Sequence, residues 1–269
     1  YAIKSNSEIE VFITTFNNNL QRNIEENIIE FFLLNNFGTR QNKGFGSYTV
    51  RSINNKPIDE KKVEELKKAI YLKKSDKKNS FNNVFSFILE EYQLLKSGIN
   101  NPFGRNPVYK KSELFKYFIT KDIRWEKRFI KKKLNSMGVD LIHNHEPIDN
   151  NNANNSYYNS YEDQQKNDYK FIRALLGLAE NYEYATNNVG RIKVKINSVN
   201  SGIERFKSPI FYKVIDNVVY LKTDETYKDI EGKEFEFKYN GTLGKLTVPT
   251  NFNLDDFINK HISKNWTKI

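Results

Sequence analysis

Three glycines and two cations fall within ten consecutive residues near the start of the chain, Gly38-Thr-Arg-Gln-Asn-Lys-Gly-Phe-Gly-Ser47. Glycine adopts positive φ angles without strain and lets the backbone approach another molecule closely. Arg40 and Lys43 place positive charge on the same turn. Backbone N–H groups beside cations are what a phosphate group needs. This segment, called the glycine-rich loop below, therefore predicts an anion site on a nucleic-acid backbone.

The elements expected around the loop argue against two common phosphate-binding motifs. A dinucleotide fingerprint has a strand before its glycines and a helix after them. Here residues 24–34 predict a helix before the loop and residues 48–53 a strand after it. A Walker loop needs a Lys-Ser/Thr pair that is missing here. The alternative to an anion site is a helix that ends at a glycine and turns tightly into a strand.

Candidate catalytic groups are scarce. His143 and His145 lie two residues apart, and a metal site would need a third ligand such as Glu146 or Asp149. A general base for RNA cleavage would need a partner group, and no partner motif is visible. We therefore expect no catalytic residue, no metal and no cofactor. His261 is expected to be structural or exposed.

The segments that must position the loop are predicted from their periodicity. Residues 1–16 alternate between apolar and polar side chains, which predicts a strand with one buried face. Residues 24–34 carry an apolar stripe at helical spacing. Further helices are expected over residues 59–73 and 81–96, and Ser112 is expected to cap another.

A strongly basic segment follows, Lys121–Leu134, with Trp125 and Phe129 on one helical face. Its cations could bind RNA phosphate, or they could form a solvated outer face. The aromatic pair is expected to be core, and the role of the cations stays open.

Beyond this segment the expected structure becomes rich in strands. Residues 149–167 have almost no aliphatic side chains and predict a mobile loop. A helix is predicted over residues 168–182, and a short closing helix over 254–265. Asp216-Asn217 and Asn240-Gly241 are expected hairpin turns. The predicted strands are 191–199, 210–215, 218–223, 234–239 and 243–248.

Composition narrows the class of protein. The chain has 269 residues, enough for one large or two small domains. Its net charge of +10 favours an acidic partner, with nucleic acid ahead of a membrane surface. The absence of cysteine excludes disulfides and cysteine-ligated zinc. With no signal peptide or membrane span visible, a cytoplasmic location is expected.

Three segments together resemble a known family. The loop pattern Gly-x-Arg-x-x-Lys-Gly-Phe-Gly-Ser, between a helix and a strand, is similar to the glycine-rich loop of the RAMP superfamily of CRISPR proteins. Residues 168–178 resemble a helix late in such chains, and residues 204–213 resemble their Arg-x-x-Ser-Pro strand. The order of the three is most like the first-subunit family of the Cmr-type (type III-B) effector.

The resemblance implies an α+β fold of ferredoxin-like, RRM-like units with a helical insertion. In that fold the glycine loop lies between the second helix and the last strand of a unit. Only one strand and one helix precede it here, so the first half of the N-terminal unit is expected to be missing from this chain. The expected parts are a half unit over 1–56, a helical region over 57–148, a disordered loop over 149–167, and a helix with a β-rich second unit over 168–269.

For function, the resemblance implies a non-catalytic, RNA-binding subunit of a CRISPR ribonucleoprotein in antiviral defence. Its partners would be guide or target RNA and other subunits of the effector. One alternative is a guide-processing endoribonuclease of the same superfamily. The other is a scaffold protein that does not bind RNA. The residues expected to line the RNA contact are Gly38, Arg40, Lys43, Gly44, Gly46 and Ser47.

Overall fold

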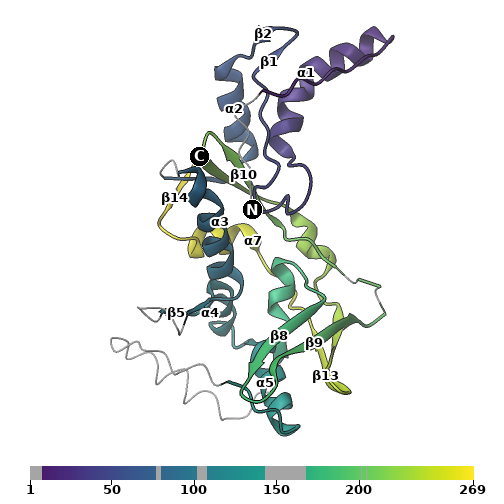
Figure 1. Ribbon diagram of the computed structural model, residues 1–269, viewed down its shortest axis with the longest axis vertical. Helices are drawn as coiled ribbons and strands as arrows, with labels where there is room; N and C mark the ends of the chain where they lie inside the picture. The colour runs from purple at the N-terminus through teal and green to yellow at the C-terminus, as the bar shows by residue number, and fades with distance from the viewer. Residues whose placement is uncertain (1–7, 77–79, 102–107, 143–167, 201, 204) are drawn as a thin grey trace. The chain divides into compact units, whose positions relative to one another are not determined.

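The computed structural model describes residues 8–76, 80–101, 108–142 and 168–269, apart from 201 and 204 (Figure 1). Two compact units are built from separated stretches of chain. Unit 1 consists of residues 1–89, 210–224 and 263–269, and unit 2 of residues 90–209 and 225–262. The boundaries expected from the sequence at 56, 148 and 167 do not coincide with those of the units. The expected mobile loop over 149–167 lies outside the described residues.

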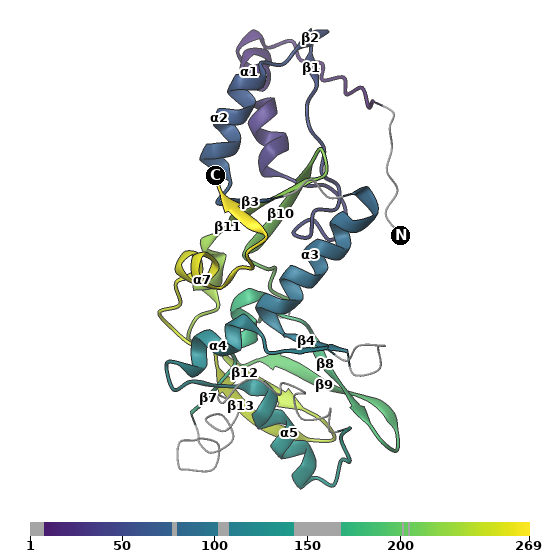
Figure 2. The ribbon, with the colours of Figure 1, turned by 90° about the vertical axis from the view of Figure 1, so that its left-hand side faces the viewer.

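The helices of unit 1 begin at side-chain caps that the sequence supplies. The Asn17 side chain accepts hydrogen bonds from two backbone N–H groups at the start of α1, and Asp59 accepts one at the start of α2. Both helices agree with the sequence prediction, and they run side by side in Figure 2. Helix α3 begins in unit 1 and continues past residue 89 into unit 2. The bounds are α1 Asn18–Leu34, α2 Glu60–Ile70 and α3 Phe81–Lys96.

A four-stranded antiparallel sheet lies at the centre of unit 1, in the order β10-β11-β3-β14. The predicted turn at Asp216-Asn217 joins β10 and β11, and both turn residues have the positive φ that this hairpin needs. One core cluster joins α1 to the sheet through Ile29, Leu33 and Tyr220. The strands are β3 Lys73–Ser75, β10 Ile210–Ile215, β11 Val218–Thr223 and β14 Trp266–Lys268.

The predicted strand over residues 1–16 is wrong where the structure describes it. Residues 8–16 form no strand, and Phe12 is 86% exposed. Alternating residues make a strand only where a neighbouring strand completes the ladder, and the four places in the sheet are filled by other segments. The sheet of unit 1 therefore does not depend on this segment. A half-sheet was expected beside the glycine-rich loop, but the described residues of unit 1 form a four-stranded sheet instead.

The predicted strand over 48–53 is also mostly wrong. Only its last two residues pair, as β1 Ser52–Ile53 with β2 Lys56–Pro57. Asn54 and Asn55 both have positive φ and form the two-residue turn between them.

Unit 2 contains a second four-stranded antiparallel sheet, in the order β13-β12-β9-β8. The predicted turn at Asn240-Gly241 joins β12 and β13. Ser112 caps α4 as predicted, by accepting from the N–H of Phe115. The sheet strands are β8 Asn181–Thr186, β9 Gly190–Ser198, β12 Glu234–Lys238 and β13 Thr242–Thr247.

The remaining elements of unit 2 are short. Strands β4 and β5 pair antiparallel, and β6 and β7 pair parallel. Their bounds, with those of the helices, are β4 Ile99–Asn101, β5 Val108–Lys110, α4 Glu113–Ile119, β6 Arg124–Trp125, α5 Glu126–Ser136, β7 Tyr169–Lys170, the 3-10 helices η1 Ile172–Leu176 and η2 Glu225–Asp229, and α7 Leu254–His261.

The predicted helix over 168–182 is wrong, because this segment forms β7, η1 and the start of β8. All five residues of η1 are buried, so the segment has no solvent-facing side of the kind an amphipathic helix needs. Gly177 then turns the chain with φ of 102°, and its backbone lies against Ser208. The closing helix also ends earlier than predicted, at His261.

The described residues thus form an α+β protein of helices and several antiparallel sheets. Among these residues, no helix has the length and apolar character needed to cross a bilayer.

Candidate nucleic-acid interface

The glycine-rich loop is a closed turn that follows α1 and is fixed to strand β10. The N–H of Phe37 donates to the carbonyl of Gly46 at 3.0 Å and closes the base of the loop. Inside it, Lys43 N donates to Arg40 O at 2.8 Å. The N–H of Tyr212 on β10 donates to the carbonyl of Asn42 at 3.1 Å. The loop is therefore held at a defined position on the sheet of unit 1.

Two of the loop glycines are required by internal packing. Gly46 has φ of 68°, and a Cβ there would lie 1.7 Å from the carbonyl oxygen of Phe37. Gly44 has φ of 80°, and its Cβ would lie 2.9 Å from Val214 and 3.0 Å from Ile88. Gly38 also has positive φ, but nothing lies within 4 Å of a Cβ at that position. Close approach of an RNA backbone is therefore not needed to explain Gly44 or Gly46.

Ser47 is also used inside the protein. Its hydroxyl oxygen accepts from the N–H of Val214 at 3.1 Å and lies 2.9 Å from both the Asn36 carboxamide oxygen and the Gly44 carbonyl. Asn36 is buried, and its amide nitrogen donates to the carbonyls of Gln41 and Tyr212. Ser47 and Asn36 together fasten the loop to β10. Sequence reasoning missed Asn36, because asparagine is frequent throughout the chain and carries no distinct signal.

Arg40 and Lys43 differ in their exposure. Arg40 is exposed, has φ of 55°, and places its guanidinium 5.9 Å from the centre of the Phe45 ring. Phe45 in turn stacks on Phe85, with ring centres 4.3 Å apart. Lys43 is half-buried, and burial lowers its pKa, with a smaller contribution from the charge of Arg40. Arg40 is thus the more accessible of the two cations.

Two further lysines, missed by sequence reasoning, hold the end of α1. The ammonium of buried Lys213 donates to the carbonyls of Phe32 and Asn35 at 2.6 and 2.7 Å. The ammonium of Lys222 donates to the carbonyl of Leu34 at 3.1 Å. Burial, and then the charge of Lys222, lowers the pKa of Lys213 to about 7. The last carbonyls of a helix need such donors, and α1 has no basic residue in its own last turn.

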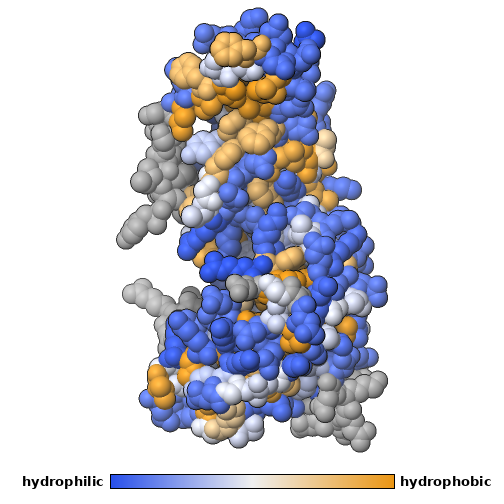
Figure 3. Space-filling model, turned by 90° about the vertical axis from the view of Figure 1, so that its right-hand side faces the viewer, coloured by the Kyte–Doolittle hydropathy of each residue, from blue (hydrophilic) through white to orange (hydrophobic). Residues whose placement is uncertain are grey.

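An aromatic cluster borders the loop in the sequence and the structure. Phe31, Phe32, Phe37 and Tyr48 form successive ring contacts, with centres 5.4 to 6.0 Å apart. Phe31 and Tyr48 remain 48% and 45% exposed. Figure 3 shows apolar side chains gathered on the surface of unit 1. Exposed aromatic rings are suited to stacking with nucleic-acid bases.

The basic segment Lys121–Leu134 includes β6 and most of α5. Trp125 packs on Phe115 at 5.0 Å and Phe129 on Tyr169 at 5.8 Å, both half-buried, which agrees with the expected structural role. The cations do not share one exposed face: Lys132 and Lys133 are exposed, whereas Lys127, Arg128 and Lys131 are half-buried.

The histidines provide no site in the described part of the chain. His143 and His145 lie outside it. His261 has its Nδ1 3.2 Å from a carboxylate oxygen of Glu113 and stacks on Phe257, which is a structural setting. Among the described residues, no three His, Cys, Asp or Glu side chains are placed to hold a metal ion.

Comparison with protein families gives two matches. A model of the Cmr1 N-terminal domain matches residues 1–99, and a model of the Cmr1 C-terminal domain matches residues 109–268. Comparisons with curated proteins and with solved structures gave no match.

Proposed function

Because the chain belongs to the Cmr1 family, and is therefore a subunit of a type III-B CRISPR effector, we propose that it binds RNA backbone through the glycine-rich loop. This assignment confirms the resemblance drawn from the loop and the two later segments. In the proposal the protein has no catalytic role in this contact. Sequence selection would come from base pairing between guide and target, so the subunit needs only to hold phosphate and sugar.

The observation that carries the proposal is the exposed guanidinium of Arg40 on a loop that the fold fixes from behind. The loop is bonded to β10 through Asn42 and Ser47, so little conformational entropy is lost when a phosphate binds. Lys43 adds a second positive charge, and the exposed rings of Phe31 and Tyr48 offer stacking surface. Gly44, Gly46 and Ser47 contribute by shaping the loop, while Gly38 leaves space beside it.

We also infer a ferredoxin-like strand order for the sheet of unit 1, with one of the connecting helices, α7, counted in unit 2. Along the chain, β3 is followed by helix α3, then by β10 and β11, then by helix α7 and β14. The sheet order is β14-β3-β11-β10, so the first and third of these strands are central and the second and fourth are at the edges. This is the strand order of a β-α-β-β-α-β unit. The second sheet comes from two insertions into this unit: β8 and β9 lie between α3 and β10, and β12 and β13 lie between β11 and α7.

The experiment is a titration of labelled single-stranded RNA with the purified protein. Arg40→Ala should weaken binding by a similar factor for RNAs of different sequence, because a phosphate contact carries no base information. Arg22→Ala, which removes the same charge from an exposed residue near the start of α1, is the matched control. Loss at one RNA sequence only would contradict a backbone role.

A second candidate function, subunit assembly without RNA binding, is favoured by a different observation. Large apolar side chains stand exposed on the segment before α1 and on the helix itself, and contiguous apolar surface marks interaction sites. They are Ile9, Val11, Phe12, Ile13, Phe16, Leu20 and Phe31. Under this function, Phe12→Ser with Phe16→Ser would lower co-assembly with other effector subunits, and Arg40→Ala would leave RNA binding by the isolated chain unchanged.

A further inference from the structure

A pocket of about 190 Å³ lies within unit 2, between α5, η1 and β8. The pocket is formed by residues of unit 2, whereas the glycine-rich loop belongs to unit 1. Its side chains are positively charged, phenolic or apolar, with one exposed carboxylate at Glu183. The lining residues are Lys127, Lys131, Leu141, Ile142, Arg173, Tyr182, Glu183, Tyr184 and Ala185.

Arg173 is the central group of this pocket. Its Nε donates to the carboxylate of fully buried Glu126, and the N–H of Ile172 donates to the other oxygen of that carboxylate at 3.0 Å. The guanidinium also lies 3.8 Å from the centre of the Tyr182 ring. Glu126 and Tyr182 therefore hold Arg173 in a fixed orientation at the wall of the pocket.

Three buried polar atoms at the pocket make no hydrogen bond of good geometry within the described part of the chain, although Tyr184 lies close enough to Arg173 to interact with it. They are Nη2 of Arg173 and the hydroxyl oxygens of Tyr182 and Tyr184. Tyr182 and Tyr184 are two residues apart on β8, so the strand directs them to the same face. All three groups can donate a hydrogen bond, and buried donors without partners are rare and costly. The geometry thus calls for an acceptor inside the pocket.

Two lysines of α5 add positive charge to the same wall. Lys127 and Lys131 are four residues apart on the helix and both line the pocket. Burial, then the charges of Arg173 and Lys131, lowers the pKa of Lys127 to about 8, and Glu126 opposes this shift. Glu183 is engaged by Arg191 at 3.3 Å. Three cations therefore face the pocket, and Glu126 neutralises one of them.

We propose that this pocket binds a phosphate group. Buried water could satisfy the three donors, but it would leave the excess positive charge uncompensated. A phosphate supplies several acceptor oxygens and up to two negative charges, which matches both the donors and the cations. The phosphate could belong to an RNA chain or to a free nucleotide. The inference does not depend on RNA binding by the glycine-rich loop.

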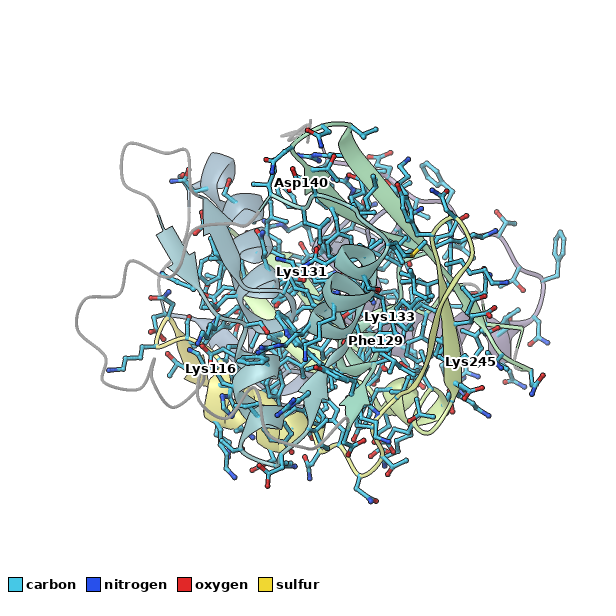
Figure 4. All side chains as sticks on the ribbon, turned by 90° about the horizontal axis from the view of Figure 1, so that it is seen from below. Lys116, Phe129, Lys131, Lys133, Asp140 and Lys245 are labelled. Carbon is cyan, nitrogen blue, oxygen red and sulfur yellow. The ribbon has the colours of Figure 1, made fainter. Side chains whose placement is uncertain are left out.

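The test is titration of the full chain with inorganic phosphate, followed by ³¹P line broadening and by thermal melting. The wild-type chain should bind and be stabilised, and Lys127→Met should weaken phosphate affinity about tenfold, because it removes one charge-assisted contact. Lys133→Met is the matched control: Figure 4 shows Lys133 beside Phe129 on the opposite side of α5 from Lys131. It should leave the affinity unchanged.

Three outcomes would overturn the proposal. They are no phosphate binding by the wild-type chain, equal loss in Lys127→Met and Lys133→Met, and the same pH dependence of affinity in the wild type and in Lys127→Met between pH 7 and 9. Phosphate gains negative charge over this range in both experiments alike. Lys127, beside Arg173, Lys131 and Glu126, loses its proton over the same range, because its pKa is lowered to about 8. The affinity of the wild type should therefore fall relative to that of Lys127→Met as pH rises.

Two further arms identify the source of the phosphate. Adenosine monophosphate is compared with short RNAs that carry a 5′-phosphate, a 3′-phosphate or hydroxyls at both ends. If the mononucleotide binds more strongly than the RNAs, the ligand of the pocket is a free nucleotide. If one of the RNAs binds and Lys127→Met weakens that binding, the ligand is a phosphate at an RNA end or in the RNA backbone. Arg40→Ala should bind inorganic phosphate like the wild type, so failure of this proposal and failure of RNA binding by the loop are separable.

Discussion

Gly46 has no space for a side chain, and this makes it the most constrained residue of the glycine-rich loop. A Cβ would overlap the carbonyl of Phe37, the residue whose N–H donates to the carbonyl of Gly46 and closes the loop. Gly38, in the same loop and also at positive φ, faces open space. The two glycines are thus required for different reasons: Gly46 needs both its positive φ and the missing side chain, whereas Gly38 needs only its positive φ.

This difference predicts different stabilities for two alanine variants. Gly38→Ala should cost about 1 kcal/mol of unfolding free energy, because only the left-handed φ is strained. Gly46→Ala should cost at least about 3 kcal/mol, because the clash with backbone forces the loop open as well. Urea denaturation of both variants measures this, and equal losses would show that the loop base relaxes around the new side chain.

Lys213 gives a prediction about pH. Its pKa is about 7 in the folded protein, and the ordinary value is 10.5 in an unfolded chain. Between these values the unfolded state binds more protons, so the contribution of Lys213 to stability rises with pH. The stability of the wild type relative to Lys213→Met should therefore increase by about 1–2 kcal/mol from pH 7 to pH 9.

The check for Lys213 is chemical denaturation of both proteins at the two pH values. The difference in unfolding free energy between the two proteins cancels the contributions of the other titrating lysines and tyrosines, except that of the neighbouring Lys222. A difference that stays flat or falls with pH would mean that the carbonyls of Phe32 and Asn35 keep the ammonium charged.

At the scale of the element, local signals predicted the helices and hairpins well. Capping side chains and apolar stripes located α1, α2 and α4, and the Asp216-Asn217 pair located the turn between β10 and β11. These features depend on neighbours in sequence, so the sequence is enough to recognise them.

Elements that depend on distant partners were missed. Strand β3 begins with Lys73 and Lys74, which are typical of a solvated loop, and it is a strand only because β11 and β14 pair on its two sides. Residues 168–182 carry a helical pattern but form β7, η1 and the start of β8, and the stretch 171–178 is buried throughout. The opposite error occurs at residues 8–16, which alternate like a strand and have no partner in the sheet.

The hairpin turn gives the prediction at this scale. Asn217 has φ of 65°, a conformation that asparagine adopts more easily than residues other than glycine. Asn217→Ala should cost about 1 kcal/mol and Asn217→Gly should be neutral or slightly stabilising. Thermal melting of the two variants compares them directly, and an equal loss in both would point to a role of the Asn217 side chain itself.

At the scale of the whole molecule, the chain leaves unit 1 after the first half of α3, returns for β10 and β11, leaves again, and returns for β14. Each unit is therefore completed by segments far apart in sequence. Periodicity could not reveal this interleaving, because it reports only on local burial. The glycines and cations of the candidate loop are visible in the sequence, whereas Asn36 and Lys213, which hold the loop and the end of α1, carry no signal there.

The net charge of +10 is the property of the whole chain that bears most directly on RNA. Such a charge promotes binding to any polyanion, so affinity alone does not identify a site. The number of counterions released is more specific, since each lost phosphate contact lowers the slope of log affinity against log salt by about one for duplexes and somewhat less for single strands.

The salt dependence of RNA binding by Arg40→Ala therefore tests the central proposal most directly. Titrations of one single-stranded RNA over a range of salt concentrations are compared for the wild type, Arg40→Ala and the control Arg22→Ala. We expect Arg40→Ala to bind more weakly with a slope reduced by roughly 0.7–1, and Arg22→Ala to keep the wild-type slope. Equal affinity and slope in folded Arg40→Ala and wild type would remove the glycine-rich loop from the RNA interface.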